Sequence, residues 1–487
     1  MSSKNFKSSV VTGIVWSAVQ LAINRGLSFI IKMVLAKLLF PEQFGLVGMA
    51  AVFASFVQVF NDIGIGAALV QRKDKDLREE HFQTAFWTGV IWSTSIYLLI
   101  VIVVSPLAAI FYKEPMLRQI IPALSLGVLA SPVNLVHQAQ LTRAMSFKKL
   151  AFISNVSTAF SGVLSLTLAY LGAGVWSLVF NSVATIVIAM PLFFRATGWT
   201  PKLMWDKKAF KDVFGFGVYT TGTNLFNNLI SNIDYLLIGK LLSAAALGTY
   251  TLAFVLTDTF RNQLMAMMGK VMYPVYGKKQ DDPKALKRYY LKVVKYNSIF
   301  VYPAMIFFIT LGTPFVQNYF GQKWIGAIEP LKILAVSVMI HMLTNSHASL
   351  IRGLGKPKLE MKIQFFKAVF LYVPLISLGI HFYGIVGAAY AYVLNKIFEV
   401  FIAQYFLKKL VNVTFGELLF HMRTPLIASV VAFIVSTSLY SLHLHYILCG
   451  VALFISYCAV VWLFMKDELK TQLSDLKFLK KKNLAVQ

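Results

Sequence analysis

The sequence contains few charged residues and almost no cysteine. Only 14% of its 487 residues are charged, with 20 acidic residues against 46 Lys and Arg. Soluble globular domains carry about 25% charged residues. The two cysteines, Cys449 and Cys458, have no Cys or His residues at the spacing of a metal site and cannot build a disulfide framework. These absences exclude a soluble globule, a zinc module and a disulfide-bonded scaffold.

Long apolar runs recur along the whole chain, which is 57% hydrophobic with a mean hydropathy of +0.68. A run of about twenty residues crosses a hydrocarbon core as a helix, whereas barrel strands alternate with a period of two. We therefore expect an all-α integral membrane protein. The first run is too long for a cleavable signal peptide. Fourteen transmembrane helices are predicted, at 10–38, 44–63, 83–110, 117–139, 150–171, 174–194, 213–239, 245–268, 294–316, 327–350, 362–382, 384–407, 424–442 and 446–465.

Lys and Arg are distributed unevenly over the connections between these spans. With a cytoplasmic N-terminus, the inside segments together with the adjoining span ends hold 35 of them, and the outside segments with their adjoining span ends hold six. Cytoplasmic loops are enriched in Lys and Arg, so both termini are predicted to be cytoplasmic. This asymmetry also explains the net charge of +26 without a nucleic-acid partner, and it places the basic loops beside membrane lipids.

The chain repeats itself weakly at an offset of 203–212 residues. Residues 36–45 match 239–248, and Gly172 matches Gly384. Six spans per repeat give both halves the same orientation, and transporters built this way bind substrate between the halves. We expect a six-helix bundle at 1–200, a second bundle at 201–408 related by a pseudo-two-fold axis, and helices 13 and 14 with a basic cytoplasmic tail at 409–487.

The first span of each half carries polar side chains at intervals of three or four residues, which places them on one helical face. Such groups are costly in lipid, so we expect both stripes to line a wet central cavity. The alternative is hydrogen bonding between the helices of a dry bundle. The predicted cavity residues are Gln20, Asn24, Ser28 and Lys32 in the first span, and Asn224, Asn227, Asn228 and Ser231 in the seventh.

Two arginines inside the spans are the sharpest candidates for anion binding, since an ionisable residue at membrane depth is by default a functional candidate. Arg25 and Arg261 lie one in each half, and a guanidinium stays charged and binds phosphate oxygens bidentately. Together they are expected to hold a diphosphate. The alternatives are buried ion pairs of Arg261 with Asp258, and of Arg25 with Asp62 or Asp234.

Further ionisable residues within the spans give secondary predictions. Lys367 and Lys396 are candidates for anion contact, although Lys396 can instead pair with Glu399 three residues later. Lys32 and Asp62 can alternatively reach the membrane surface from the ends of their spans. The candidates for binding a coupling ion are Asp62, Asp234 and Asp258.

Catalytic motifs are absent from the sequence. It has no GxxxxGK[ST] phosphate loop and no HExxH metal motif. We therefore expect neither an enzyme nor a cofactor or metal. The energy for any transport must then come from an ion gradient, the membrane potential or downhill substrate flux.

The stretch AKLLFPEQFG at 36–45, with residues 12–17 and 62–71, resembles the Wzx-type polysaccharide transporters of the multidrug/oligosaccharidyl-lipid/polysaccharide exporter superfamily, closest to the colanic-acid and teichuronic-acid branch. The resemblance implies two six-helix bundles around a central cavity and alternating access. It also implies flipping of an undecaprenyl-diphosphate-linked oligosaccharide to the outer leaflet. Related lipid II flippases carry cationic residues on spans 1 and 8, and Arg25 and Arg261 match these in span and type.

The sequence thus favours a flippase in the bacterial cytoplasmic membrane. Its expected partners are the lipid-linked substrate, membrane lipids, a polysaccharide polymerase and glycosyltransferases. A drug or cation antiporter of the same superfamily is one alternative, and it would need a cavity whose charged lining residues are mainly carboxylates. A polymerase or ligase is another, and would need a large outside loop that this chain lacks.

Overall fold

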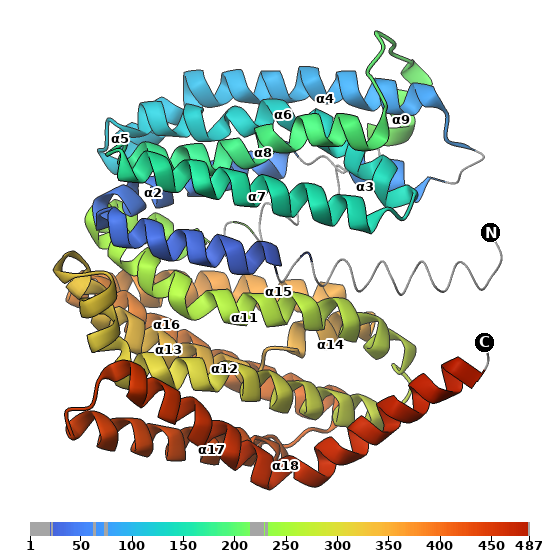
Figure 1. Cartoon of the computed structure of the whole chain (residues 1–487). Helices are drawn as coiled ribbons and strands as arrows, with labels where there is room; N and C mark the ends of the chain where they lie inside the picture. Colours follow the sequence, from blue (N-terminus) through green and yellow to red (C-terminus); the bar gives the residue numbers. More distant parts are fainter. Residues whose placement is uncertain are drawn as a thin grey trace. The chain divides into compact units, whose positions relative to one another are not determined.

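The computed structural model describes residues 20, 23–61, 65–72, 76–214, 228 and 232–485, and every regular element within them is a helix. This is the expected result for a chain whose backbone polar groups must be satisfied inside lipid. The chain divides into two compact units, Met1–Leu252 and Ala253–Gln487, in each of which long helices run side by side (Figure 1). The division into six-helix bundles at residue 200 stays a prediction.

The first unit begins with a helix over 23–38. The π-helical segment η2 joins α4 to α5, and a helix over 232–241 precedes α11. The labelled elements are α2 (Pro41–Asn61), α3 (Ile65–Gln71), α4 (Glu79–Leu99), η2 (Ile100–Val104), α5 (Ser105–Tyr112), α6 (Leu117–Arg143), α7 (Phe147–Tyr170), α8 (Val175–Thr197) and α9 (Lys207–Phe214).

The second unit contains most of α11 (Ala244–Lys278) and everything after it. The long α16 is interrupted by non-helical residues Tyr383 and Gly384. The elements are α12 (Pro283–Tyr319), η3 (Gln322–Ala327), α13 (Ile328–Met342), α14 (His347–Gly353), α15 (Pro357–Lys367), η4 (Ala368–Tyr372), α16 (Val373–Val411), α17 (Phe415–Ser441) and α18 (Tyr446–Ala485).

Ten helices of the described chain are long and apolar enough to cross a membrane. One of them, Lys358–Val411, holds two predicted spans on either side of the break at Gly384. The predicted spans 10–38 and 213–239 are only partly described, and 245–268 lies in α11, which is not among the ten. The all-helical membrane fold is confirmed, and the count of fourteen stays a prediction.

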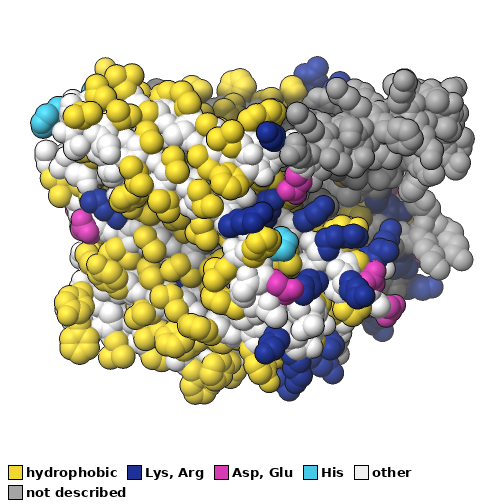
Figure 2. All heavy atoms as spheres, turned by 90° about the horizontal axis from the view of Figure 1, so that it is seen from below, with side chains coloured by type: hydrophobic (Ala, Val, Ile, Leu, Met, Phe, Trp, Pro, Cys, Tyr) yellow, Lys and Arg dark blue, Asp and Glu magenta, His cyan; other side chains and the backbone are white. Residues whose placement is uncertain are grey.

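Basic side chains are concentrated at one end of the second unit. On the face seen in Figure 2, hydrophobic side chains cover one side and most of the visible Lys and Arg gather at the other. This is the distribution expected where helices leave the hydrocarbon on a cytoplasmic side. The exposed cations at the matching ends of α11, α12 and α16 include Lys278, Lys284, Arg288, Lys408 and Lys409.

One helical connection recurs with the same backbone geometry. Gly174, which precedes α8, has φ 57° and ψ −128°, and Gly384 within α16 has φ 57° and ψ −137°. Glycine adopts this conformation without the steric penalty of a side chain. The two glycines are 210 residues apart, within the range of the repeat offset. The structural counterpart of Gly384 is therefore Gly174, two residues after the Gly172 that the sequence repeat paired with it.

Two further glycines allow helices from the two repeats to touch through their backbones. A Cβ on Gly45 of α2 would overlap the carbonyl of Ala244 at the start of α11, and a Cβ on Gly248 would overlap the carbonyl of Pro41. Gly45 and Gly248 are 203 residues apart, as are Pro41 and Ala244. The contact is therefore reciprocal, as a pseudo-two-fold relation between α2 and α11 requires.

We predict that Gly45→Ala and Gly248→Ala each lower the thermal unfolding temperature of the purified chain. In an open helix, Gly→Ala is stabilising by up to about 1 kcal/mol, but here the added methyl meets backbone, and such overpacking costs about 1–3 kcal/mol. Gly416→Ala is the control, because nothing lies within 4 Å of its added Cβ. Unfolding of Gly45→Ala at or above the wild-type temperature would contradict the close crossing.

Candidate functional site

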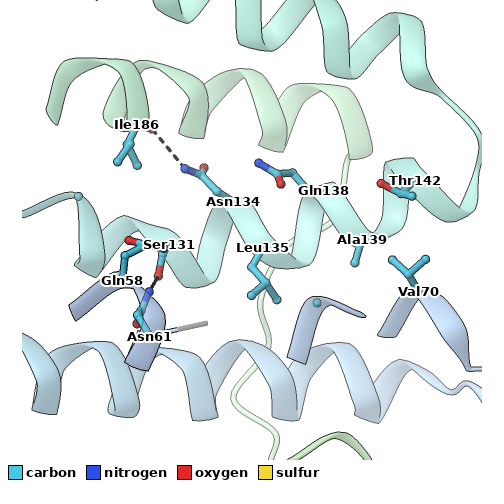
Figure 3. A pocket seen from close by; sticks show the side chains of 12 residues that line it. Gln58, Asn61, Val70, Ser131, Asn134, Leu135, Gln138, Ala139, Thr142 and Ile186 are labelled. Carbon is cyan, nitrogen blue, oxygen red and sulfur yellow. Dashed lines mark hydrogen bonds between the residues drawn. The ribbon is translucent and has the colours of Figure 1, made fainter. Parts of the chain in front are cut away.

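A polar pocket of about 590 Å³ lies in the first unit, between α2, α3, α6 and α8 (Figure 3). The described lining contains no ionisable side chain. Pockets of 300–1,000 Å³ with a few convergent polar groups are typical ligand sites. The polar lining consists of four amides and two hydroxyls, from Gln58, Asn61, Ser131, Asn134, Gln138 and Thr142.

Helix α6 supplies most of this lining from one face. Ser131, Asn134, Gln138 and Thr142 follow one another at intervals of three or four residues, so their side chains share a side of the helix. The same spacing rule that identified the polar stripes of the first and seventh spans would have found them. The sequence analysis did not name them. Helix α6 contains Pro122 and Pro132 and is continuous through both.

Several polar atoms of the pocket remain available to a ligand. Asn61 Nδ2 donates to Ser131 Oγ (2.6 Å), and Asn134 Nδ2 donates weakly to the carbonyl of Ile186 (3.5 Å), as drawn in Figure 3. Within the described chain, the buried Asn134 Oδ1 has no hydrogen-bond partner. An unsatisfied buried acceptor costs about 1–3 kcal/mol. The side chains of Gln58 and Gln138 are exposed, and their amides are within reach of a ligand.

Arg143 fixes one end of the pocket. Its Nη1 donates to the carbonyls of Leu69 (2.8 Å), Val70 (3.0 Å) and Arg72 (2.6 Å). The carbonyls of Leu69 and Val70 belong to the last turn of α3, where carbonyls have no acceptor role within the helix, and Arg72 follows the helix. Because Val70 and Thr142 both line the pocket, this cap holds α3 and α6 at a fixed separation there.

The predicted cavity residues of the first span point in different directions. Asn24 donates to Thr158 Oγ1 (2.6 Å) and Ser154 Oγ (3.1 Å) of α7, so it makes the hydrogen bonds between helices that were the alternative. Arg25 and Lys32 are seven residues apart, share a face of the helix and are exposed. Gln20 and Ser28 are half-buried.

The predicted residues of the seventh span are only partly within the described chain. Asn224, Asn227 and Ser231 lie outside it, and so does Asp62 of the second span. Asn228 Nδ2 donates to the carbonyl of Ser55 in α2 (2.7 Å) and its Oδ1 accepts from Ser55 Oγ (3.0 Å). Asp234 is buried and accepts from the backbone N–H of Tyr235 (2.9 Å) and the hydroxyl of Tyr250 (3.2 Å).

In the second unit, Arg261 and Asp258 form an ion pair on α11. Both residues are buried, with 7% and 3% of their surfaces exposed. The structure thus brings Arg261 together with the carboxylate that the sequence analysis named as its alternative partner. A guanidinium in this position is neutralised within its own helix.

Glu399 of α16 pairs with two buried lysines from different helices. Its Oε1 accepts from Lys367 Nζ of α15 (2.7 Å) and its Oε2 from Lys396 Nζ (2.9 Å), which also donates to the hydroxyl of Tyr372 (2.8 Å). His341 Nδ1 of α13 lies 3.6 Å from Glu399 Oε2. The Lys396–Glu399 pair was an open alternative in the sequence, and the contact from Lys367 was not foreseen. These lysines tie α15 and α16 together.

Comparison with known proteins identifies the family. Residues 34–329, well over half of the chain, match the sequence profile of a family described as "Polysaccharide biosynthesis protein". The chain belongs to this family. The resemblance found in the sequence is thereby confirmed. Within the described part of this family member, no group of His, Cys, Asp and Glu side chains could hold a metal ion.

Two curated relatives carry names from polysaccharide biosynthesis. The chain is 28% identical to the teichuronic acid biosynthesis protein TuaB of Bacillus subtilis (strain 168) over 314 residues, 62% of this chain and 63% of TuaB. The match thus spans less than two thirds of TuaB. It is 24% identical to the lipopolysaccharide biosynthesis protein WzxC of Escherichia coli (strain K12) over 447 residues, 89% of this chain and 88% of WzxC.

Two solved structures share the fold of this family member. The lipid II flippase MurJ in an inward closed conformation superposes with a TM-score of 0.71 at 12% identity, covering 94% of this chain and all of MurJ. An inward-facing multidrug resistance MATE family transporter of the MOP superfamily superposes with a TM-score of 0.61 at 16% identity, covering 81% and 95%. The fold is that of MOP-superfamily transporters.

We predict that Glu399→Gln destabilises the protein by about 3 kcal/mol, because removing one partner of a buried ion pair leaves charge uncompensated. Thermal unfolding of the purified chain measures the effect. Glu329→Gln is the control, since its pair with Lys332 is exposed and such pairs contribute about 1 kcal/mol or less. Equal unfolding temperatures for the two variants would show that Glu399 does not hold these lysines.

Proposed function

We propose that this protein is a flippase that moves an undecaprenyl-diphosphate-linked oligosaccharide, the repeat unit of a cell-surface polysaccharide, from the cytoplasmic to the outer leaflet. Membership of the polysaccharide biosynthesis family and the similarity to TuaB and WzxC support the substrate class. The MOP transporter fold supports the activity of translocation. The proposal includes no catalytic role and no cofactor.

The single observation that carries the proposal is the uncharged amide and hydroxyl lining of the pocket in the first unit. Sugars present many hydroxyls that both donate and accept hydrogen bonds, and amide side chains offer both complements. Asn134, Gln138, Thr142 and Gln58 supply these groups from two helices. A cationic drug would instead favour carboxylates, and the described lining has none.

Arg25 and Lys32 are proposed to meet the diphosphate. Both are exposed on one face of the helix over 23–38, and a charge at membrane depth belongs beside water or an opposite charge rather than lipid. A guanidinium can bind phosphate oxygens through two hydrogen bonds. Arg261, Lys367 and Lys396 already contact carboxylates, so Arg25 becomes the first candidate for the anion.

The proposed orientation places both termini in the cytoplasm of a bacterial cell, with the chain in the cytoplasmic membrane. The basic ends of the helices support it. Arg72 and Arg143 then lie on the cytoplasmic side, and so does the end of the pocket that Arg143 fixes. Substrate made in the cytoplasm would enter at this end. A polymerase and glycosyltransferases are the proposed partners before and after transport.

Alternating access between two repeats is the proposed mechanism. The reciprocal contact of Gly45 and Gly248 supplies a direct junction between helices of the two repeats. The proposed driving force is an ion gradient, the membrane potential or substrate flux. Asp62, Asp234 and Asp258 remain the proposed coupling-ion residues, although Asp258 already pairs with Arg261.

We predict that the double variant Asn134→Leu/Gln138→Leu lowers polymer export about tenfold or more while the protein level holds. Each lost hydrogen bond is worth about 0.5–1.5 kcal/mol, and 1.4 kcal/mol is a factor of ten. Export is measured in a deletion strain carrying each variant, together with the leaflet in which lipid-linked substrate accumulates.

The matched control is Gln140→Leu, on the same helix but outside the pocket lining. A flippase defect leaves substrate unflipped in the cytoplasmic leaflet, whereas a ligase or polymerase defect leaves it in the outer leaflet. Normal export by the double variant would refute the role of the pocket. Accumulation in the outer leaflet would refute the flippase.

A further inference from the structure

The segment between α8 and α9 is fixed along the first turns of α4. Gln83 Oε1 accepts from the backbone N–H of Lys202 (2.6 Å), and Trp87 Nε1 donates to the carbonyl of Lys202 (2.7 Å). Thr84 Oγ1 accepts from the backbone N–H of Asp206 (3.0 Å). The side chains that follow therefore project from a backbone held in place.

An aromatic cluster secures the start of the same segment. Trp199 Nε1 donates to Glu79 Oε1 (2.6 Å), and the Trp199 ring lies 5.4 Å from His137 and 5.8 Å from Phe86, centroid to centroid. His137 Nδ1 also shares a hydrogen bond with Thr197 Oγ1 (2.7 Å). The segment is thus attached to α4 and α6 along its length.

Beyond this attachment the segment presents a bare apolar surface. Leu203 is 89% exposed and Trp205 is 53% exposed. With Met204 of the segment and Trp87 and Ile91 of α4 they line an apolar groove of about 330 Å³. Exposed apolar side chains that cluster on a fixed backbone mark a contact surface.

Exposed lysines flank the groove residues in the sequence. Asp206 Oδ1 accepts from the backbone N–H of Ala209 (2.7 Å) and so begins the short helix α9. Ala209 is buried, and the Phe210 ring packs 5.6 Å from that of Trp205. This arrangement leaves the lysines of an amphipathic helix facing outward. The exposed lysines of the segment and α9 are Lys202, Lys207, Lys208 and Lys211.

The groove lies where a membrane-spanning helix leaves the hydrocarbon. After Glu80, the sequence as far as Tyr112 contains no Asp, Glu, Lys or Arg, and Trp87 and Ile91 stand near the beginning of that run. Tryptophan is enriched at the level of lipid headgroups. Lysines beside such a groove are placed to meet anionic headgroups.

We propose that α4 and residues 202–211 form a binding site for an anionic phospholipid of the cytoplasmic leaflet. An acyl chain lies against Trp87, Ile91, Leu203 and Trp205, and the lysines contact the phosphate. The apolar groove and the lysines lie side by side, as the acyl chain and the anionic phosphate do in such a lipid. Because this segment connects the two predicted halves of the chain, bound lipid would steady that connection, whatever the transported substrate is.

The test compares binding of phosphatidylglycerol and phosphatidylcholine to the purified full chain by native mass spectrometry. The variant is Lys207→Gln/Lys208→Gln/Lys211→Gln. Each lysine near an anionic surface strengthens binding by about fivefold, so we expect the variant to lose at least about tenfold in affinity for phosphatidylglycerol. Its affinity for phosphatidylcholine should stay at the wild-type value.

The matched control is Lys278→Gln/Lys279→Gln/Lys284→Gln, which removes three exposed lysines from another basic loop. It should keep the wild-type preference for phosphatidylglycerol, and Leu203→Ser should weaken binding of both lipids. The proposal would be overturned if the Lys207/Lys208/Lys211 variant bound phosphatidylglycerol with wild-type affinity. It would also be overturned if the control lost as much affinity for phosphatidylglycerol as that variant. Displacement of phosphatidylglycerol by soluble glycerol phosphate at equal concentration would also overturn it, because the acyl chain would then contribute nothing.

Discussion

The cost of an unpaired polar group in hydrocarbon is the constraint on which the structure depends. A polar side chain within a span must find a partner in the protein or face a space that holds water or substrate. In the second unit, Glu399 meets the constraint for two buried side chains by pairing with Lys367 and Lys396. In the first unit, the polar face of α6 instead opens into a pocket in which Asn134 Oδ1 has no partner in the described chain. This contrast assigns the two sets of polar residues different roles.

The sequence was sufficient to predict the all-helical membrane class, because the hydrophobic and charge patterns that indicate this class extend over the whole chain. Charge-poor runs and loop lysines predicted an all-helical membrane chain. The match between residues 36–45 and 239–248 marked two segments whose glycines, Gly45 and Gly248, each lie against the backbone of the other segment's helix. Helical periodicity also predicts which residues share a face. Periodicity does not say which neighbouring helix that face meets. For this reason, some polar residues predicted to face a cavity instead bind a neighbouring helix.

Particular residues show where such reasoning ends. Asn24 and Arg25 are adjacent in one predicted cavity stripe, yet Asn24 bonds Thr158 of α7 and Arg25 is exposed. Lys367 meets Glu399 through a contact between α15 and α16 that no local spacing encodes. A readable signal that the sequence analysis did not use is the spacing of three or four residues between Ser131, Asn134, Gln138 and Thr142.

The most direct measurement of the central claim is translocation by the purified chain in liposomes. A fluorescent undecaprenyl-diphosphate oligosaccharide is placed in both leaflets, and a membrane-impermeant reductant bleaches the outer one. The account predicts that the wild-type chain moves labelled lipid from the inner to the outer leaflet, so that it is bleached as well. The Arg25→Ala variant, inserted in the same amount, is expected to leave the labelled lipid of the inner leaflet unbleached. The contradicting result would be obtained with the wild-type chain under an imposed ion gradient and membrane potential. If only the labelled lipid of the outer leaflet were bleached, as in protein-free liposomes, the account would be wrong.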